Sequence, residues 1–179
     1  MPRLTAITSK SGLPPEHHAI ADEVLKVFGH IRGPFSMLLH SPKLAELVLP
    51  VVPWIREQCV VEPPLRFVAI LTTAREREAA YVWAAQVAQA RRHLPDATID
   101  LIRSRAELDR FSAAERDVVD YTRQLVRNNR VEQKTFDALR EAHDARWLVE
   151  LTAAINYIAF VSGIVNAFEV PPPPDGDRL

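Results

Sequence analysis

The sequence has 179 residues, 47% hydrophobic and 25% charged, a composition that excludes a disordered chain and a membrane-embedded one. Its 22 Lys and Arg nearly balance 23 Asp and Glu, so the net charge of −1 gives no general basic surface for nucleic acid. The single cysteine, Cys59, excludes an intrachain disulfide and a CxxC redox pair. Only 5 glycines accompany 14 prolines, and this scarcity of turn-forming glycine favours helices over a sheet.

The N-terminal residues carry no recognisable signal for secretion. Residues 1–5 lack the apolar core of a signal peptide, and no window of the sequence holds 18 uninterrupted apolar residues. We therefore expect a cytoplasmic protein that does not enter a membrane.

Glycine and proline mark the helix boundaries in the first third of the sequence. Residues 1–13 are expected to form an N-terminal arm, followed by a helix that starts at Pro14–Pro15 and stops near Gly29. Another helix starts at Ser41–Pro42, which combines an N-cap residue with proline at the first helical position. Three further positions turn, bend or end helices in this region: Gly33–Pro34, Pro50 and Pro53.

The middle of the sequence predicts a long helical stretch. Residues 65–94 contain neither proline nor glycine and include alanine-rich segments that favour helix. Since such a length is unusual for one globular helix, we expect a bend near Thr72–Thr73, where adjacent β-branched residues weaken helix preference.

Four shorter patterns predict the remaining helices. They are the stretch from Pro95 to Ile102, the helix opened by a capping box at Ser112 and Glu115, residues 132–142, and residues 145–168. The last of these is the most apolar, so it should be the most buried. We expect an all-α fold with one helical domain of about 7–8 helices over residues 14–170, and a proline-rich flexible tail over residues 171–179.

Four segments of the sequence together resemble the sequence pattern of one protein family. They are residues 33–42, 66–76, 79–86 and 166–171. Through them the sequence is similar to the carboxymuconolactone decarboxylase family, which includes the alkylhydroperoxidase D-like (AhpD-like) proteins, over most of residues 14–171. The resemblance implies an all-helical subunit that assembles into homotrimers or hexamers, with active sites partly built at the contacts between subunits.

The redox members of this family carry a glutamate, a CxxC pair and a histidine four residues after the second cysteine. The resemblance places these groups at Phe67, Ala79, Val82 and Gln86, so all four are replaced. A peroxidatic cycle needs a thiolate and a resolving thiol, and Cys59 lies outside the motif. The sequence therefore argues against a thiol peroxidase or disulfide reductase.

The decarboxylase members generally keep the histidine, whereas Gln86 can form hydrogen bonds but cannot act as a base. On a helix, Ala79, Val82 and Gln86 fall within about 60° of one another and would line one wall of a pocket. Tyr81 and Trp83 flank that wall. Alternatively, Gln86 is a tie to a neighbouring helix, and the two aromatic residues belong to the core or to an interface.

Two residues remain as candidates for an acid or base. His40 precedes the Ser41–Pro42 cap and titrates near neutral pH if it faces the pocket, or it simply satisfies backbone groups at the helix end. Glu76 and its neighbour Glu78 either form surface ion pairs with adjacent arginines or include a dry carboxylate tuned as a general base.

We therefore expect a small-molecule enzyme that needs no thiol, metal or organic cofactor, and that catalyses decarboxylation, proton transfer or lactone or ring isomerisation on a cyclic acid. The predicted catalytic residues are His40, Glu76, Tyr81 and Gln86, and the predicted substrate-binding residues are Phe67, Ala79, Val82 and Trp83. The alternative is a catalytically silent module that binds a metabolite or a protein.

The last predicted helix carries a stripe of small and amide side chains. Its members are Thr152, Asn156, Ala159, Gly163 and Asn166. Small residues let two helices approach closely, so the stripe predicts a tight helix contact or, secondarily, a pocket lining. Together with the apolar character of this helix, the family resemblance predicts a homo-oligomer, with neither nucleic acid nor membrane as a partner.

Overall fold

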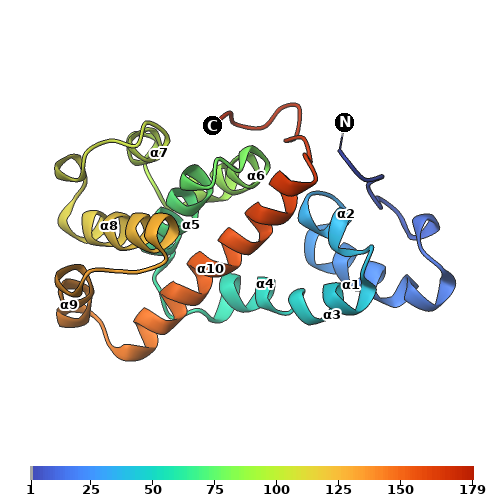
Figure 1. The fold of residues 1–179 in the computed structure, drawn as a ribbon, viewed down its shortest axis with the longest axis horizontal. Helices are drawn as coiled ribbons and strands as arrows, with labels where there is room; N and C mark the ends of the chain where they lie inside the picture. Colours follow the sequence, from blue (N-terminus) through green and yellow to red (C-terminus); the bar gives the residue numbers. More distant parts are fainter. Residues whose placement is uncertain (1) are drawn as a thin grey trace. The chain divides into compact units, whose positions relative to one another are not determined.

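The computed structural model describes residues 2–179, and every regular element in that range is helical (Figure 1). The predicted all-α class is therefore confirmed. The chain divides into two compact units. Unit 1 comprises the described residues of Met1–Cys59 together with Gly163–Pro171, and unit 2 comprises Val60–Ser162 together with Pro172–Leu179.

Unit 1 is built from short helices separated by the predicted glycine and proline positions. Gly29 ends the first α-helix with a left-handed φ of 74°, and Gly33, with a φ of 57°, precedes the next helix. The α-helices are α1 (His18–Phe28), α2 (Pro34–Leu38), α3 (Pro42–Val48) and α4 (Val51–Pro53), followed by a π-helical turn over Trp54–Gln58.

The N-terminal arm is held within unit 1 by backbone hydrogen bonds. The amide of Arg3 donates to the carbonyl oxygen of Phe168 at 2.9 Å, and the amide of Ile7 donates to that of Ser36 at 3.0 Å. The Arg3 side chain also pairs with Glu169 at 2.7 Å. These bonds join residues that are far apart in the sequence, so the arm is part of the packed unit.

Unit 2 contains the longer helices. They are α5 (Pro63–Glu76), α6 (Ala80–Ala90), α7 (Asp96–Arg103), α8 (Ala113–Asn128), α9 (Gln133–Ala142) and α10 (Ala145–Ala167), whose residues after Ser162 are assigned to unit 1. The predicted capping box is present, because Ser112 and Glu115 exchange hydrogen bonds at the start of α8.

The bend expected near Thr72–Thr73 is wrong. Helix α5 continues through both residues, which are buried, and the Thr73 hydroxyl donates to the carbonyl oxygen of Ala69 at 2.8 Å. Tertiary packing therefore overrides the weak helix preference of threonine. The break falls a few residues later, over residues 77–79, where Glu78 has a positive φ of 50°.

Helix α10 is less buried than its composition predicts. Its inner face is fully covered at Leu151, Ala154 and Ile155, but Val149 and Phe160 are exposed, and fewer than half of the residues in its most apolar stretch are buried. By length and composition it is the one described helix that could cross a membrane, a property that it shares with the core helices of soluble proteins. The structure therefore corrects the expectation that this helix is the most buried.

Candidate functional site

The α5–α6 hairpin carries seven of the eight predicted site residues. Figure 1 shows α5 and α6 side by side, and the turn between them ends at Ala79, the N-cap residue of α6. Ala79, Val82 and Trp83 are buried in unit 2. They therefore form part of the hairpin's packed interior, and in this arrangement none of them is open to a ligand.

Gln86 and Tyr81 lie at the margin of this interior, since both are half-buried. Within residues 2–179, the Gln86 side-chain amide makes no hydrogen bond, so the structure gives no support for its role as a tie to a neighbouring helix. An amide in that position can donate to and accept from a bound molecule.

Phe67 contacts His93. Within the described residues, this is the one contact between a predicted substrate-binding residue and a titratable ring. The Phe67 ring is half-buried and stacks on the exposed imidazole of His93, with centroids 5.2 Å apart and an interplanar angle of 14°. His93 follows α6, about two helical turns beyond Gln86. Sequence reasoning missed His93 because it lies in a short basic run that is typical of a solvated helix end.

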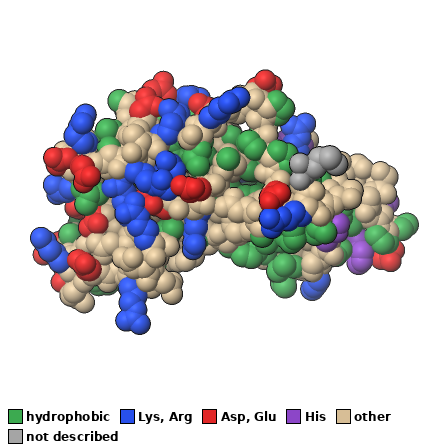
Figure 2. All heavy atoms as spheres, turned by 45° about the horizontal axis from the view of Figure 1, so that its top comes forward, with side chains coloured by type: hydrophobic (Ala, Val, Ile, Leu, Met, Phe, Trp, Pro, Cys, Tyr) green, Lys and Arg blue, Asp and Glu red, His purple; other side chains and the backbone are tan. Residues whose placement is uncertain are grey.

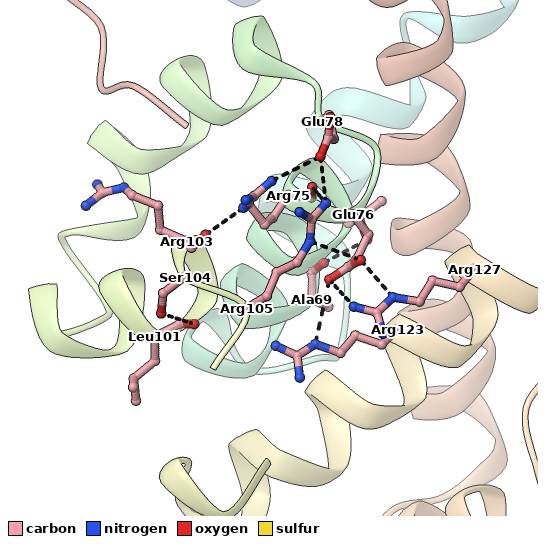
Figure 3. Close-up of polar contacts among 11 residues, drawn as sticks. Ala69, Arg75, Glu76, Glu78, Leu101, Arg103, Ser104, Arg105, Arg123 and Arg127 are labelled. Atoms are coloured by element: carbon pink, nitrogen blue, oxygen red, sulfur yellow. Dashed lines mark hydrogen bonds and ion pairs between the residues drawn. The ribbon is translucent and has the colours of Figure 1, made fainter. Parts of the chain in front are cut away.

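Glu76, the last residue of α5, has a side chain that is only 4% exposed and is surrounded by three arginines. Arg127 donates from Nε to Oε2 at 2.8 Å and from Nη2 to Oε1 at 2.9 Å. The Nε atoms of Arg105 and Arg123 lie 3.5 and 3.7 Å from the same carboxylate. Figure 3 shows these guanidinium groups converging on Glu76. Because both oxygens already accept hydrogen bonds, this carboxylate is better suited to an ion-pair network than to proton abstraction.

The arginines around Glu76 respond differently to their surroundings. Burial lowers the pKa of the Arg123 guanidinium, although the charge of Glu76 opposes that shift. In contrast, the hydrogen bonds to Glu76 raise the pKa of Arg127. Glu78, which is exposed, accepts a hydrogen bond from Arg105, and this bond lowers the pKa of the Glu78 carboxyl.

The sequence predicted ion pairs between these two glutamates and nearby arginines. Glu78 does pair with Arg75, at 3.6 Å. The partner of Glu76 could not be read from the sequence, because Arg127 lies 51 residues beyond it. Only the packing of α5 against α8 brings that pair together. Basic and acidic side chains are also mixed at the surface of the molecule. Figure 2 shows Lys and Arg side chains beside Asp and Glu side chains.

His40, the eighth predicted residue, belongs to unit 1. Its side chain is exposed, and Nε2 donates to the carbonyl oxygen of Thr5 at 2.9 Å. The ring therefore ties the N-terminal arm to the turn after α2. The sequence alternative gave His40 a backbone partner at the helix end, whereas the partner is a carbonyl group of the arm.

Comparison with known proteins gives matches among solved structures alone. No family model matches the chain. No curated protein matches it either. The debrominase Bmp8, solved as a cysteine-to-alanine variant with 2,3,4-tribromopyrrole, is 16% identical, with a TM-score of 0.76 over 97% of this chain and 95% of that chain.

Two further solved structures have a similar fold. An uncharacterised peroxidase-related protein with an alkylhydroperoxidase AhpD core, from Ralstonia eutropha JMP134, is 16% identical, with a TM-score of 0.76 over 97% of this chain and 93% of its own. A protein of unknown function from Agrobacterium tumefaciens, described as related to antioxidant defence protein AhpD, is 18% identical, with a TM-score of 0.69 over 76% and 94%. The chain therefore has the AhpD-like fold that the sequence predicted.

Proposed function

We propose that the protein catalyses a non-redox reaction on a small organic molecule at the α5–α6 hairpin. The reaction class is proton transfer, decarboxylation, or lactone or ring isomerisation of a cyclic acid. The observation that carries this proposal is the stacking of Phe67 on His93, which sets an exposed imidazole against a predicted substrate-binding residue. Imidazole is the side chain that most readily exchanges protons near neutral pH.

The other residues of the hairpin have supporting roles in this proposal. The Gln86 amide, which makes no hydrogen bond within residues 2–179, orients a carbonyl or carboxylate group of the substrate. Tyr81 contributes a half-buried aromatic surface from the first turn of α6. His93 thus takes the acid–base role that the sequence assigned to His40 and Glu76.

Non-redox chemistry is proposed because the motif positions hold no thiol. Ala79 and Val82 stand where the redox members carry cysteines, and the sequence contains only Cys59. One thiol cannot complete the thiolate and resolving-thiol cycle without a second thiol from elsewhere.

A substrate panel tests this proposal. Cyclic acids, lactones and brominated pyrroles are incubated with the full chain in D₂O, and NMR follows deuterium incorporation, loss of carbon dioxide and ring rearrangement. The pyrroles are included because one structural neighbour holds 2,3,4-tribromopyrrole. Turnover that falls about 10²- to 10⁴-fold in His93→Asn supports the proposal.

The variant Gln86→Ala tests whether the Gln86 amide orients the substrate. Gln89→Ala is its matched control, since Gln89 is an exposed glutamine on the same helix.

A binding module is the second candidate, and a specific observation favours it. Both predicted acid–base groups already have partners, since Glu76 accepts two hydrogen bonds from Arg127 and His40 donates to Thr5. If a panel compound binds and Gln86→Ala weakens it, but no compound is converted, the protein is a binding module and the enzymatic proposal is wrong.

A further inference from the structure

The segment of residues 172–179 belongs to unit 2, and Asp177 holds it against the helices of that unit. The two carboxylate oxygens of Asp177 accept hydrogen bonds from Nη1 and Nη2 of Arg91, both at 2.7 Å. Nη2 of Arg103, at the end of α7, lies 3.9 Å from the same carboxylate. The Asp177 side chain is only 24% exposed. Two arginines from different parts of unit 2 therefore meet at this carboxylate. Each also has an exposed partner of its own, since Arg91 Nε donates to Asp96 at 3.0 Å and Arg103 pairs with Asp100.

Gly176 sets how closely this segment approaches α6. A Cβ atom at Gly176 would lie 2.7 Å from Cβ of Ala84 and 3.2 Å from the carbonyl oxygen of Pro173. Since Ala84 Cβ is fixed to the helix backbone, no larger residue fits at position 176 without moving the segment. The glycine lets the backbone lie directly on α6 and bring Asp177 to Arg91.

The surroundings of Asp177 contain more N–H donors than its carboxylate satisfies. Nε1 of Trp83 and Nε of Arg103 are buried, and neither has a hydrogen-bond acceptor among the residues that the structure describes. The Arg103 guanidinium carbon lies 5.5 Å from the centre of the Trp83 ring, so the guanidinium group is placed over the indole face. Figure 3 shows the Arg103 guanidinium directed away from the arginines around Glu76.

Buried N–H groups almost always find an acceptor in folded proteins. Asp177 supplies two oxygens, and Arg91 uses both. The donors left over on Trp83 and Arg103 therefore fit an anion with more acceptor atoms than one carboxylate has.

We propose that Arg91, Arg103 and Trp83 form a binding site for a small oxyanion, and that Asp177 occupies this site as an internal competitor. The ligand class is an anion with at least three acceptor oxygens, namely a phosphate group or a dicarboxylate. Arginine and indole groups only donate hydrogen bonds, so the site selects acceptors that carry negative charge. Binding of the anion displaces Asp177 and releases residues 172–179 from α6.

The segment covers a different side of α6 from Val82 and Gln86, because at 100° per residue Ala84 points about 160° away from both. Trp83 is the one residue that this site shares with the predicted substrate-binding residues. The proposed function assigns no role to Trp83, so the inference does not depend on whether the hairpin catalyses a reaction.

The test follows the indole N–H of Trp83 by ¹⁵N NMR in the full chain. The sequence has 3 Trp residues, so Trp54→Phe and Trp147→Phe assign the Trp83 resonance by elimination. Inorganic phosphate and malonate are titrated separately, with sodium chloride holding the ionic strength constant. We expect a saturable shift of the Trp83 resonance with at least one of the two anions, and the anion that binds more tightly identifies the ligand class.

Variants decide whether Asp177 competes for the site. Asp177→Asn should lower the apparent Kd of the anion, by about tenfold if the segment occupies the site nine-tenths of the time. Gly176→Ala should act in the same direction without changing any charge, because it pushes the segment off Ala84. Arg91→Gln should raise the Kd at least about tenfold, since it removes the bidentate donor.

Two neighbours serve as matched controls. Asp175 and Arg92 are exposed, so Asp175→Asn and Arg92→Gln should leave the Kd unchanged. The proposal is overturned if neither anion shifts the Trp83 resonance, or if sodium chloride alone produces the same shift. An affinity that is equal in the wild type, Asp177→Asn and Arg91→Gln also overturns it.

Discussion

Glu76 and Arg127 meet through two parallel hydrogen bonds of 2.8 and 2.9 Å, although α5 and α8 contribute them from positions 51 residues apart. Replacing the carboxylate removes the charge on which Arg105, Arg123 and Arg127 converge, and leaves Glu78 as the acidic partner of Arg105. Breaking a fully buried pair costs about 3–5 kcal/mol, and the half-exposed Arg127 reduces this value. We predict that Glu76→Gln lowers the free energy of unfolding by about 2 kcal/mol, measured by urea denaturation.

Glu78→Gln is the control for this prediction, because the Glu78 side chain is 68% exposed and also pairs with Arg105. Its effect should stay within about 0.5 kcal/mol. Equal losses in the two variants would show that burial of Glu76 does not determine the strength of the network.

The pKa of Asp177 offers a test of its contact with Arg91. The hydrogen bonds from Arg91 lower this pKa below the ordinary value of 3.8; burial opposes the shift, and the charges of Arg91 and Arg103 reinforce it. A lowered pKa means that the contact stabilises the segment fully above pH 3.8, and that this contribution is lost as the pH falls through the lowered value.

We therefore predict that the Asp177 carboxyl, followed by ¹³C NMR, titrates below 3.8 in the wild type and returns towards 3.8 in Arg91→Gln. Asp175 provides an internal reference, since it is exposed in the same segment. Identical titration curves for Asp177 in the two proteins would refute the contact.

Self-association through α10 is a further prediction. Val149, Ala153 and Phe160 are exposed on one side of this helix, together with Asn156. This leaves a largely apolar stripe without cover in the described chain. Gly163 continues the side that sequence reasoning assigned to a tight helix contact, and nothing lies within 4 Å of the position that its Cβ would take. We propose that a second copy of the chain covers the stripe in a homo-oligomer.

Analytical ultracentrifugation checks this prediction. Phe160→Glu should shift the protein towards a species of 20.2 kDa, the mass of one chain. Phe136→Glu on α9 is the matched control, because Phe136 and Phe160 are 39% and 40% exposed. A wild type that sediments as one chain at micromolar concentration contradicts the prediction.

We predict no hydroperoxide reductase activity. Ala79 and Val82 stand at the positions that the sequence resemblance aligns with the cysteines of redox AhpD-like proteins. A dithiol reductant should therefore support no turnover of an organic hydroperoxide in a coupled assay. Turnover that Cys59→Ser abolishes would reverse this conclusion, while the same turnover in both proteins would point to a contaminant.

The fold could be predicted to a large extent because its helix boundaries have local causes. Pro34, Pro42 and Pro63 each stand at the first position of a helix, and the Ser112–Glu115 capping box begins α8. The break between α5 and α6 was misplaced, because packing and not local preference carries the helix past Thr72 and Thr73.

The site was less predictable, because its contacts join distant positions. Helical geometry applies to Val82 and Gln86, which both lie on α6, whereas Ala79 is the N-cap residue before that helix. The spacing also could not show that Ala79 and Val82 are buried. The stacking of Phe67 on His93 depends on how two antiparallel helices are aligned, and no spacing in the sequence reports that alignment.

Because Ala79 and Val82 are buried, a pair of thiols is difficult to introduce at these two positions. The substitution Ala79→Cys adds a sulfur atom where Ala79 has no exposed surface, and such overpacking costs about 1–3 kcal/mol. A thiol introduced by Val82→Cys would be shielded from solvent and from its oxidant. A working thiol pair at these two positions would thus require compensating changes in the surrounding helices, so the present sequence stands several substitutions away from a thiol enzyme.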